Sequence, residues 1–166
     1  FSAALSHQSG YVCVSNVHTT MMGVFSSHYQ NITNNSLFSV PDGMPLVWAM
    51  KSMGANHQDR IRGPSLMKDL CEKGREKNIR HYLYGGSPQV IEALKAALEK
   101  KYPGVQIVGA ESPPFKPIEE ITEVEWQSSA DRINQSGAHF VWIGLGAPKQ
   151  ELWMWEQRKR VKPIMF

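Results

Sequence analysis

The part of this chain best suited to holding a ligand is a glycine turn followed by three polar residues, 149–151. The apolar run 139–143 is predicted to be a buried strand, and Gly144 and Gly146 interrupt it before a predicted helix, 149–160. Backbone N–H groups at a helix start can bind an anion such as a diphosphate. An ordinary turn between a strand and a helix has the same glycine spacing, but polar residues at the carboxyl end of a strand favour a ligand site.

Two further polar residues follow predicted strands in the same way. Asp42 comes directly after the run 37–41, and Asn16 comes directly after the run 11–15. Aspartate and asparagine in these places are good helix caps. Both also lie at the edge of the sheet where a carboxylate can act as a general base on a bound hydroxyl. The sequence leaves capping and a site role open for each of them.

Arginines and a second glycine turn complete the candidate residues. Arg60 and Arg62 lie in the loop 54–63, where they are either solvated charges or a clamp for phosphate or carboxylate oxygens. Gly85 and Gly86 follow the predicted strand 80–84 and precede a helix. This junction repeats the strand, glycine and helix order of the first one.

Predicted strands and helices alternate along the chain and position these residues. A fourth strand is expected at 105–109. Helices are expected at 16–30, 45–53, 64–77, from 88 to Pro103 and up to about 137, with connections at 31–36 and 111–118. This alternation is typical of a mostly parallel sheet with helices on both faces. We therefore expect an α/β, Rossmann-like fold in a single domain, 1–166.

Composition excludes several classes of protein. An apolar share of 42% and a formal net charge of +3 are ordinary for a globular protein and do not by themselves indicate nucleic-acid binding. Cys13 and Cys71 form no CxxC motif, which favours a reducing compartment and no structural zinc. No run of about 18 apolar residues and no export signal occurs. The chain begins within a predicted helix and stops in the apolar run 163–166, so we expect a fragment truncated at both ends.

Ordered motifs along nearly the whole chain resemble the WecG/TagA/CpsF glycosyltransferase family, glycosyltransferase family 26. They are Asn16, PDGMPLVW at 41–48, RIRGPSLM at 60–67, YLYGGSPQV from 82, YPGVQIVG from 102 and GLGAPKQE at 144–151. The most specific pieces are 41–43 and 144–151. The resemblance implies transfer of a sugar from a UDP-sugar to an undecaprenyl-diphosphate-linked sugar. It implies inversion at the anomeric carbon, and a peripheral enzyme at the inner face of the bacterial cytoplasmic membrane.

The same resemblance implies roles for individual residues. Asp42 would be the base that removes the proton from the acceptor hydroxyl. The donor site would consist of Asn16, Arg60, Gly85, Gly86, Gly144, Gly146, Lys149 and Gln150. Arg60 and backbone N–H groups would stabilise the leaving diphosphate, with no metal and no cofactor. No nucleic-acid partner is expected, and the oligomeric state, a homo-oligomer included, is left open.

The sequence departs from the family pattern in one motif and leaves alternatives open. The family often has Thr-x-Asn where this chain has Val14, Ser15 and Asn16, and Ser15 is expected to point to the other face of the strand. The basic run 158–162 beside two tryptophans is either a membrane contact or a solvated helix end. A nucleotide-binding module without transfer activity is the alternative function. A dinucleotide-dependent oxidoreductase is disfavoured because neither glycine turn gives GxGxxG.

Overall fold

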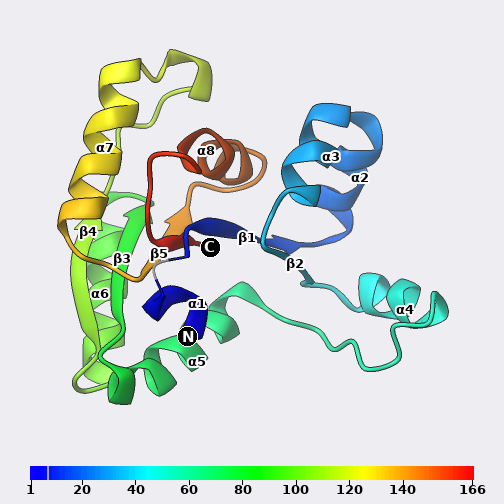
Figure 1. Ribbon diagram of the computed structural model, residues 1–166, viewed down its shortest axis with the longest axis horizontal. Coiled ribbons are helices and arrows are strands. Elements are labelled where there is room, and N and C mark those ends of the chain that lie inside the picture. The colour runs from blue at the N-terminus through cyan, green and yellow to red at the C-terminus, as the bar shows by residue number, and fades with distance from the viewer. Residues whose placement is uncertain (7) are drawn as a thin grey trace.

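The computed structural model describes residues 1–6 and 8–166 and contains one all-parallel sheet (Figure 1). The order of its six strands is β2-β1-β6-β5-β3-β4. Their bounds are β1 (Gly10–Ser15), β2 (Phe38–Pro41), β3 (Arg80–Gly85), β4 (Gln106–Glu111), β5 (Phe140–Gly144) and β6 (Ile164–Met165). Because every pair is parallel, all carboxyl ends meet at one edge of the sheet. The prediction of a Rossmann-like α/β fold is confirmed.

Helices cover both faces of this sheet. In the described part of the chain they are α1 (Ser2–Leu5), α2 (Val17–Phe25), α3 (Ser27–Asn34), α4 (Met44–Ser52), α5 (Gly63–Gly74), α6 (Pro88–Lys101), α7 (Glu123–Gln135) and α8 (Lys149–Gln157). Two short 3-10 helices, η1 (Arg75–Lys77) and η2 (Ile118–Glu120), join them. Successive side chains of a strand alternate between faces, so neighbouring residues of β5 enter different cores.

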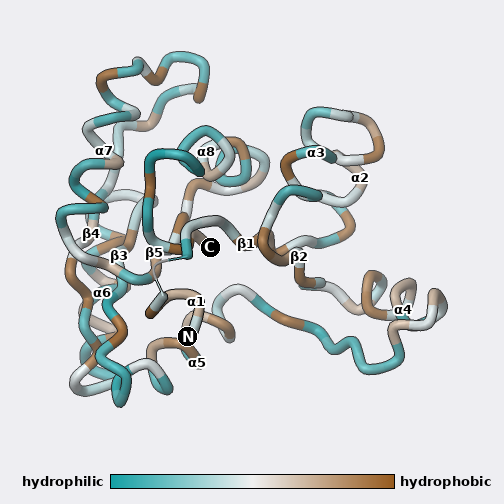
Figure 2. The backbone as a smooth tube through the Cα atoms, in the orientation of Figure 1, coloured by the Kyte–Doolittle hydropathy of each residue, from teal (hydrophilic) through white to brown (hydrophobic). Residues whose placement is uncertain are grey.

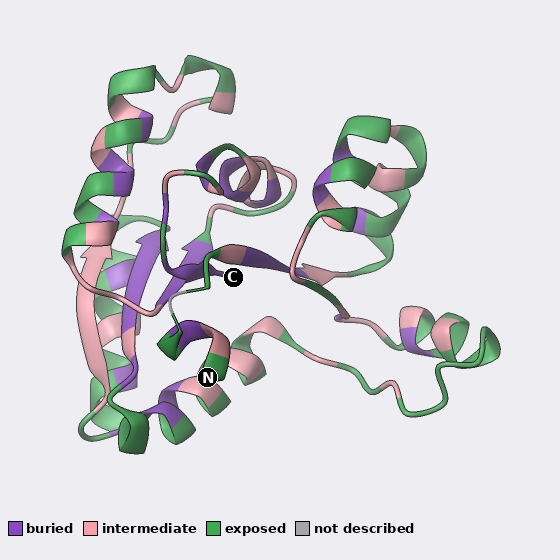
Figure 3. Ribbon diagram, in the orientation of Figure 1, coloured by how far each residue is buried: buried purple, intermediate pink, exposed green. Residues whose placement is uncertain are grey.

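One face carries α3, α7 and α8, and the other carries α1, α5 and α6. On the first face, Val141 and Ile143 of β5 pack with Trp153 of α8 and Ile133 of α7. On the second face, Trp142 packs with residues of α5 and α6, including Cys71, Ile91 and Leu98. In Figure 3 the strands β3 and β5 are coloured as buried, in keeping with their place between the two layers.

A buried histidine supports the second face. His81 of β3 is fully buried between the rings of Phe140 and Trp142, and its Nδ1 accepts a hydrogen bond of 3.2 Å from the indole Nε1 of Trp142. Burial, followed by the charge of nearby His139, lowers the pKa of His81 to about 4. This histidine is therefore a neutral acceptor in the core near neutral pH.

Strand β6 joins the two halves of the sheet through only two residues. Ile164 pairs with Gly10 of β1 and with Phe140 of β5, while Met165 pairs with Tyr11 and Val141. Within the sheet, the pair β2-β1 is therefore connected to the three strands β5-β3-β4 by this short strand. Within the apolar run 163–166, only Ile164 and Met165 form the strand.

The segment after β2 projects from the body of the molecule. Figure 1 shows α4 and the loop that follows it extending beyond the β2 edge, and Figure 2 colours that loop largely as hydrophilic. Val47 is the one buried residue of α4, whereas Trp48 is 62% exposed. The segment returns to the sheet where Ile61 donates a backbone hydrogen bond of 2.9 Å to Pro41. Both ends of the projection thus lie at the end of β2.

Three boundary predictions were wrong. The helix expected at 149–160 ends at Gln157. A single helix was expected at 16–30 and a connection at 31–36, but two helices meet at Ser26 and the second continues to Asn34. Ser26 has an extended backbone, and its Oγ accepts a hydrogen bond from the Tyr29 amide, so it starts a new helix as an N-cap. Strand β4 also ends at Glu111, two residues later than expected.

Candidate active site

A cavity of about 550 Å³ lies at the carboxyl edge of the sheet and brings together residues far apart in the sequence. Six of the nine predicted site residues line it: Asn16, Asp42, Gly85, Gly86, Gly144 and Gln150. They follow or end β1, β2, β3 and β5, or begin α8. The opening of a parallel sheet at its carboxyl edge is the usual place for a ligand. Apolar side chains of the wall include Met67, Val90 and Trp142, which the sequence did not single out.

Asn16 is both a helix cap and part of the cavity wall. Its Oδ1 accepts a hydrogen bond of 3.0 Å from the Thr19 amide, and Thr19 Oγ1 accepts one of 2.9 Å from the Asn16 amide. This reciprocal pair is a capping box at the start of α2. Since Oδ1 and the backbone N–H of Asn16 are used by the cap, its side-chain nitrogen Nδ2 is the atom left to contact a ligand. Asn16 therefore both caps α2 and lines the cavity, so the capping role and the site role are compatible.

Asp42 is fixed from both its backbone and its side chain. Its amide donates to the Ser15 carbonyl at 2.7 Å, which extends the pairing of β1 and β2 by one residue. Its Oδ1 accepts hydrogen bonds from Nε and Nη2 of Arg60, both at 3.3 Å. The Asp42 side chain is 27% exposed, so it remains reachable from the cavity. Arg62 is exposed at the start of α5 and does not line this cavity.

The ends of β3 and β5 approach each other through glycines. Gly85 has φ 118°, and a Cβ there would lie 2.5 Å from the Gly144 carbonyl oxygen. Gly86 has φ 74°, and its amide donates to that same oxygen at 3.1 Å. Only glycine fits this arrangement without strain. Gly85, Gly86 and Gly144 therefore form a part of the cavity wall without side chains, which we call the glycine floor. The Gly86 N–H is already hydrogen-bonded to the Gly144 carbonyl.

Lys149 faces a neighbouring cavity of about 710 Å³ that shares Gly86 and Gly144 with the first. Its Nζ donates to the Lys116 carbonyl at 2.6 Å and lies 5.3 Å from the centre of the Phe115 ring. Lys149 is thus directed toward the proline-rich loop. It lines this neighbouring cavity and does not line the first one.

The start of α8 is set by Gly146 and contains a buried acid that the sequence left without a role. Gly146 has φ 77°, and its carbonyl accepts a hydrogen bond of 2.9 Å from the Gln150 amide. The side chain of Gln150 lines the first cavity and donates from Nε2 to Glu151 Oε1 at 2.9 Å. Glu151 is 2% exposed. A charged side chain that is almost fully buried is unusual, so its place beside the cavity wall suggests a role in the site. The structure shows this burial, and residue spacing in the sequence does not.

Val14, which stands where the family pattern has threonine, lies in the cavity wall. Val14 lines the cavity, whereas Ser15 Oγ is 2.9 Å from Ser39 Oγ on the other face of β1. The prediction that Ser15 points away is therefore confirmed. At this point the cavity has an apolar methyl surface in place of the hydroxyl of the family pattern.

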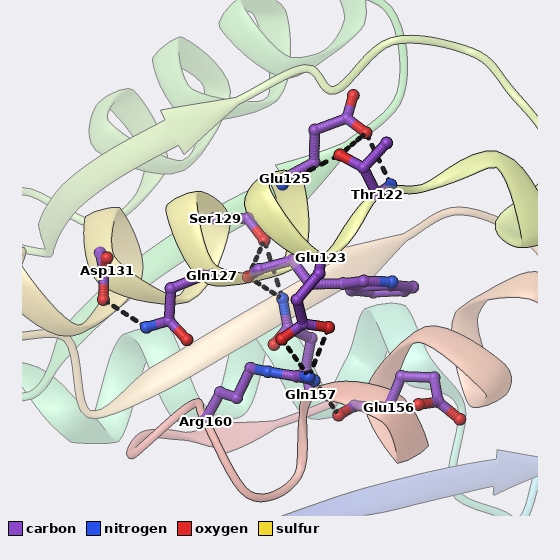
Figure 4. Close-up of polar contacts among 10 residues, drawn as sticks. Thr122, Glu123, Glu125, Gln127, Ser129, Asp131, Glu156, Gln157 and Arg160 are labelled. Atoms are coloured by element: carbon purple, nitrogen blue, oxygen red, sulfur yellow. Dashed lines mark hydrogen bonds and ion pairs between the residues drawn. The ribbon is translucent and has the colours of Figure 1, made fainter.

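The basic run after α8 is engaged with the protein through its two arginines, whereas Lys159 and Lys162 are exposed. Figure 4 shows Arg160 directed at Glu123 of α7, and their Nη2 and Oε1 atoms are 2.8 Å apart. Gln157, also drawn there, donates from Nε2 to the Trp126 carbonyl and to Ser129 Oγ, both at 2.8 Å. Trp153 is 1% exposed and belongs to the core. The Gln157 contacts attach the carboxyl end of α8 to α7, at the opposite end of the helix from the site residues 149–151.

The described residues, 1–6 and 8–166, contain neither a metal-binding cluster nor a membrane-spanning helix. No group of three or more His, Cys, Asp or Glu residues suited to a metal occurs among them. Within the same residues, no helix has the length and apolar character needed to cross a bilayer.

Comparisons with known proteins give one consistent family. The model of the glycosyl transferase WecG/TagA/CpsF family matches residues 1–166. A curated relative from Bacillus spizizenii, N-acetylglucosaminyldiphosphoundecaprenol N-acetyl-beta-D-mannosaminyltransferase, is 26% identical over 152 residues. The match covers 92% of this chain and 56% of that relative, so the chain spans about half the relative's length.

Proposed function

Because the chain belongs to the glycosyl transferase WecG/TagA/CpsF family, we propose that it transfers a sugar from a UDP-sugar to an undecaprenyl-diphosphate-linked sugar. The relative's name specifies a lipid-diphosphate-linked N-acetylglucosamine as the acceptor, and we extend that acceptor class to this chain. The product would serve bacterial cell-surface polysaccharide synthesis. The reaction would take place in the cytoplasm at the inner face of the membrane. The domain that carries this activity includes residues 1–166.

The observation that carries the proposal is the meeting of Asp42 with Gly85, Gly144 and Gln150 around one cavity. These residues come from two halves of the sheet that β6 joins. A transferase needs a base for the acceptor on one side of the bond being made and a holder for the leaving group on the other. The cavity offers a carboxylate on the β2 side and glycine turns with helix starts on the β3 and β5 side.

In the proposed reaction, the acceptor hydroxyl oxygen attacks the anomeric carbon as the bond from that carbon to UDP breaks. Asp42 takes the hydroxyl proton, and the electron pair of the broken bond leaves with UDP. A single displacement of this kind inverts the anomeric carbon and needs one carboxylate. Arg60 already contacts Oδ1, so Oδ2 of Asp42 is the oxygen available as the base.

Arg60 also suits the leaving group. A guanidinium has five N–H donors and can contact a carboxylate and a diphosphate oxygen together. We propose that Arg60, Asn16 and the N–H groups near Gly144 and Gly146 stabilise the charge on the leaving UDP without a metal ion. Lys149 would contribute from the border of the neighbouring cavity. The glycine floor would bring the donor close to the backbone.

The test of the base is Asp42→Asn in the full chain. General-base loss is expected to lower the transfer rate at least about a hundredfold, with little change in the unfolding midpoint. Asp59→Asn is the matched control, because Asp59 is an acidic residue of the loop after α4 and its side chain is 92% exposed. Product formation from UDP-sugars and a prenyl-diphosphate-linked acceptor is measured by mass spectrometry. A folded Asp42→Asn protein with wild-type turnover would contradict the assignment.

The second candidate function is a nucleotide-binding module without transfer activity. The observation that favours it is Val14, which places methyl groups in the cavity wall where the family pattern has a hydroxyl. Calorimetry with UDP and product analysis separate the two candidates. A binding module takes up UDP and forms no product with any UDP-sugar, whereas the transferase does both.

A further inference from the structure

Glu151 is a buried acid next to the candidate active site, and the proposed reaction does not use it. It occupies the third position of α8, where an acidic side chain often reaches back to the backbone N–H of the N-cap residue. The N-cap here is Pro148, which has no N–H. The side chain instead accepts the hydrogen bond from Gln150. Its location in the first turn also places the negative charge at the positive end of the helix dipole.

Tyr29 of α3 provides a second buried polar group near Glu151. The Tyr29 hydroxyl and Glu151 Oε2 are both buried, and neither has a hydrogen-bond partner among the described residues. One is a donor and the other an acceptor. Burial, followed by the Glu151 charge, raises the pKa of Tyr29. Burial and then the Glu151 charge likewise raise the pKa of Cys13 on β1 to about 12.

From this geometry we infer that Glu151 is a positioning residue that fixes the side-chain amide of Gln150 in one orientation. A carboxylate only accepts hydrogen bonds, so the NH2 group of Gln150 must face Glu151. The carbonyl oxygen of Gln150 is then the atom presented to the cavity. The Tyr29 hydroxyl, which is buried and unpaired like Oε2, is the donor that would complete this arrangement.

This inference rests on the proposed function, and it specifies which part of the UDP-sugar donor contacts Gln150. An oxygen acceptor repels diphosphate oxygens and accepts from a group that carries a hydrogen. The contact is therefore with a sugar hydroxyl or with an N–H of the nucleobase. The diphosphate would then be bound by Arg60 and by backbone N–H groups.

Nuclear magnetic resonance of the free protein tests the positioning without any substrate. We expect the bonded Nε2 proton of Gln150 to exchange with solvent roughly fivefold to tenfold more slowly than those of Gln89, which is exposed on α6. Gln150→Ala assigns the signal. Glu151→Leu should abolish the slow exchange, and Glu151→Gln, whose amide oxygen still accepts, should retain most of it. Unchanged Gln150 signals in Glu151→Leu would overturn the inference.

Kinetics of the full chain test the consequence for the donor. Glu151→Leu and Gln150→Ala should each raise the donor KM roughly tenfold, with kcat changed less than about threefold. The double variant should match either single one, because Glu151 acts through Gln150. Glu156→Leu, a change of an exposed acid on the same helix, should leave KM unchanged. Additive effects in the double variant would overturn the inference, whereas a wild-type chain without transfer contradicts the proposed function and leaves the resonance result intact.

Discussion

His81 should make the stability of this protein fall as pH drops below neutrality. Its folded pKa of about 4 lies below the value of about 6.5 for an unperturbed histidine. Between these values the unfolded chain binds a proton that the folded chain does not, so acid favours unfolding. The contribution is fully present above pH 6.5 and is lost as pH falls toward 4. Linkage gives a loss of about 2 kcal/mol at pH 5 and about 3 kcal/mol near pH 4.

The measurement compares the wild type with His81→Gln. The glutamine amide oxygen can accept the hydrogen bond from Trp142 Nε1, and the side chain does not titrate. Carboxylates elsewhere change both proteins alike, so the difference between their pH profiles reports the histidine. Free energies of unfolding from urea titrations at pH 7, 6 and 5 should show the wild type losing about 2 kcal/mol more than the variant. Equal losses would show that His81 is not the buried neutral acceptor described above.

Other substitutions test the glycine floor and the wall of the cavity. Gly85→Ala should destabilise the fold by at least about 2 kcal/mol and reduce UDP binding, because it adds a clash with the Gly144 carbonyl to an unfavourable φ. Gly104→Ala, which has φ 88° and nothing within 4 Å of its Cβ, should cost only about 1 kcal/mol, and equal losses in chemical denaturation would contradict the clash. Val14→Thr should increase affinity for UDP-sugar in calorimetry, whereas Ser15→Thr, on the opposite face, should not.

Much of the fold and the location of the site could be predicted from the sequence. Alternating apolar runs and helices predicted a parallel sheet, and polar residues after strands predicted a site at its carboxyl edge, where Asn16, Asp42 and Gln150 now meet. These predictions worked because strand ends and helix starts depend on local chemistry.

Contacts between distant segments could not be predicted in this way. The pairing of Arg60 with Asp42, the direction of Lys149 toward Lys116 and the burial of Glu151 depend on how separate elements pack. The break at Ser26 was a local signal that the apolar pattern of the two helices concealed. Family resemblance supplied the chemistry of sugar transfer, which no spacing in the chain specifies.

The place of β6 has a consequence for synthesis on the ribosome. Strand β1 and Asp42 emerge early, but in the sheet the strands that carry Gly85 and Gly144 are paired to them through Ile164 and Met165. A nascent chain that stops before these residues has both groups of site residues and no strand to hold them together. Contacts between residues so far apart in sequence also form slowly. We therefore expect ligand binding to begin only after Ile164 and Met165 have left the ribosome.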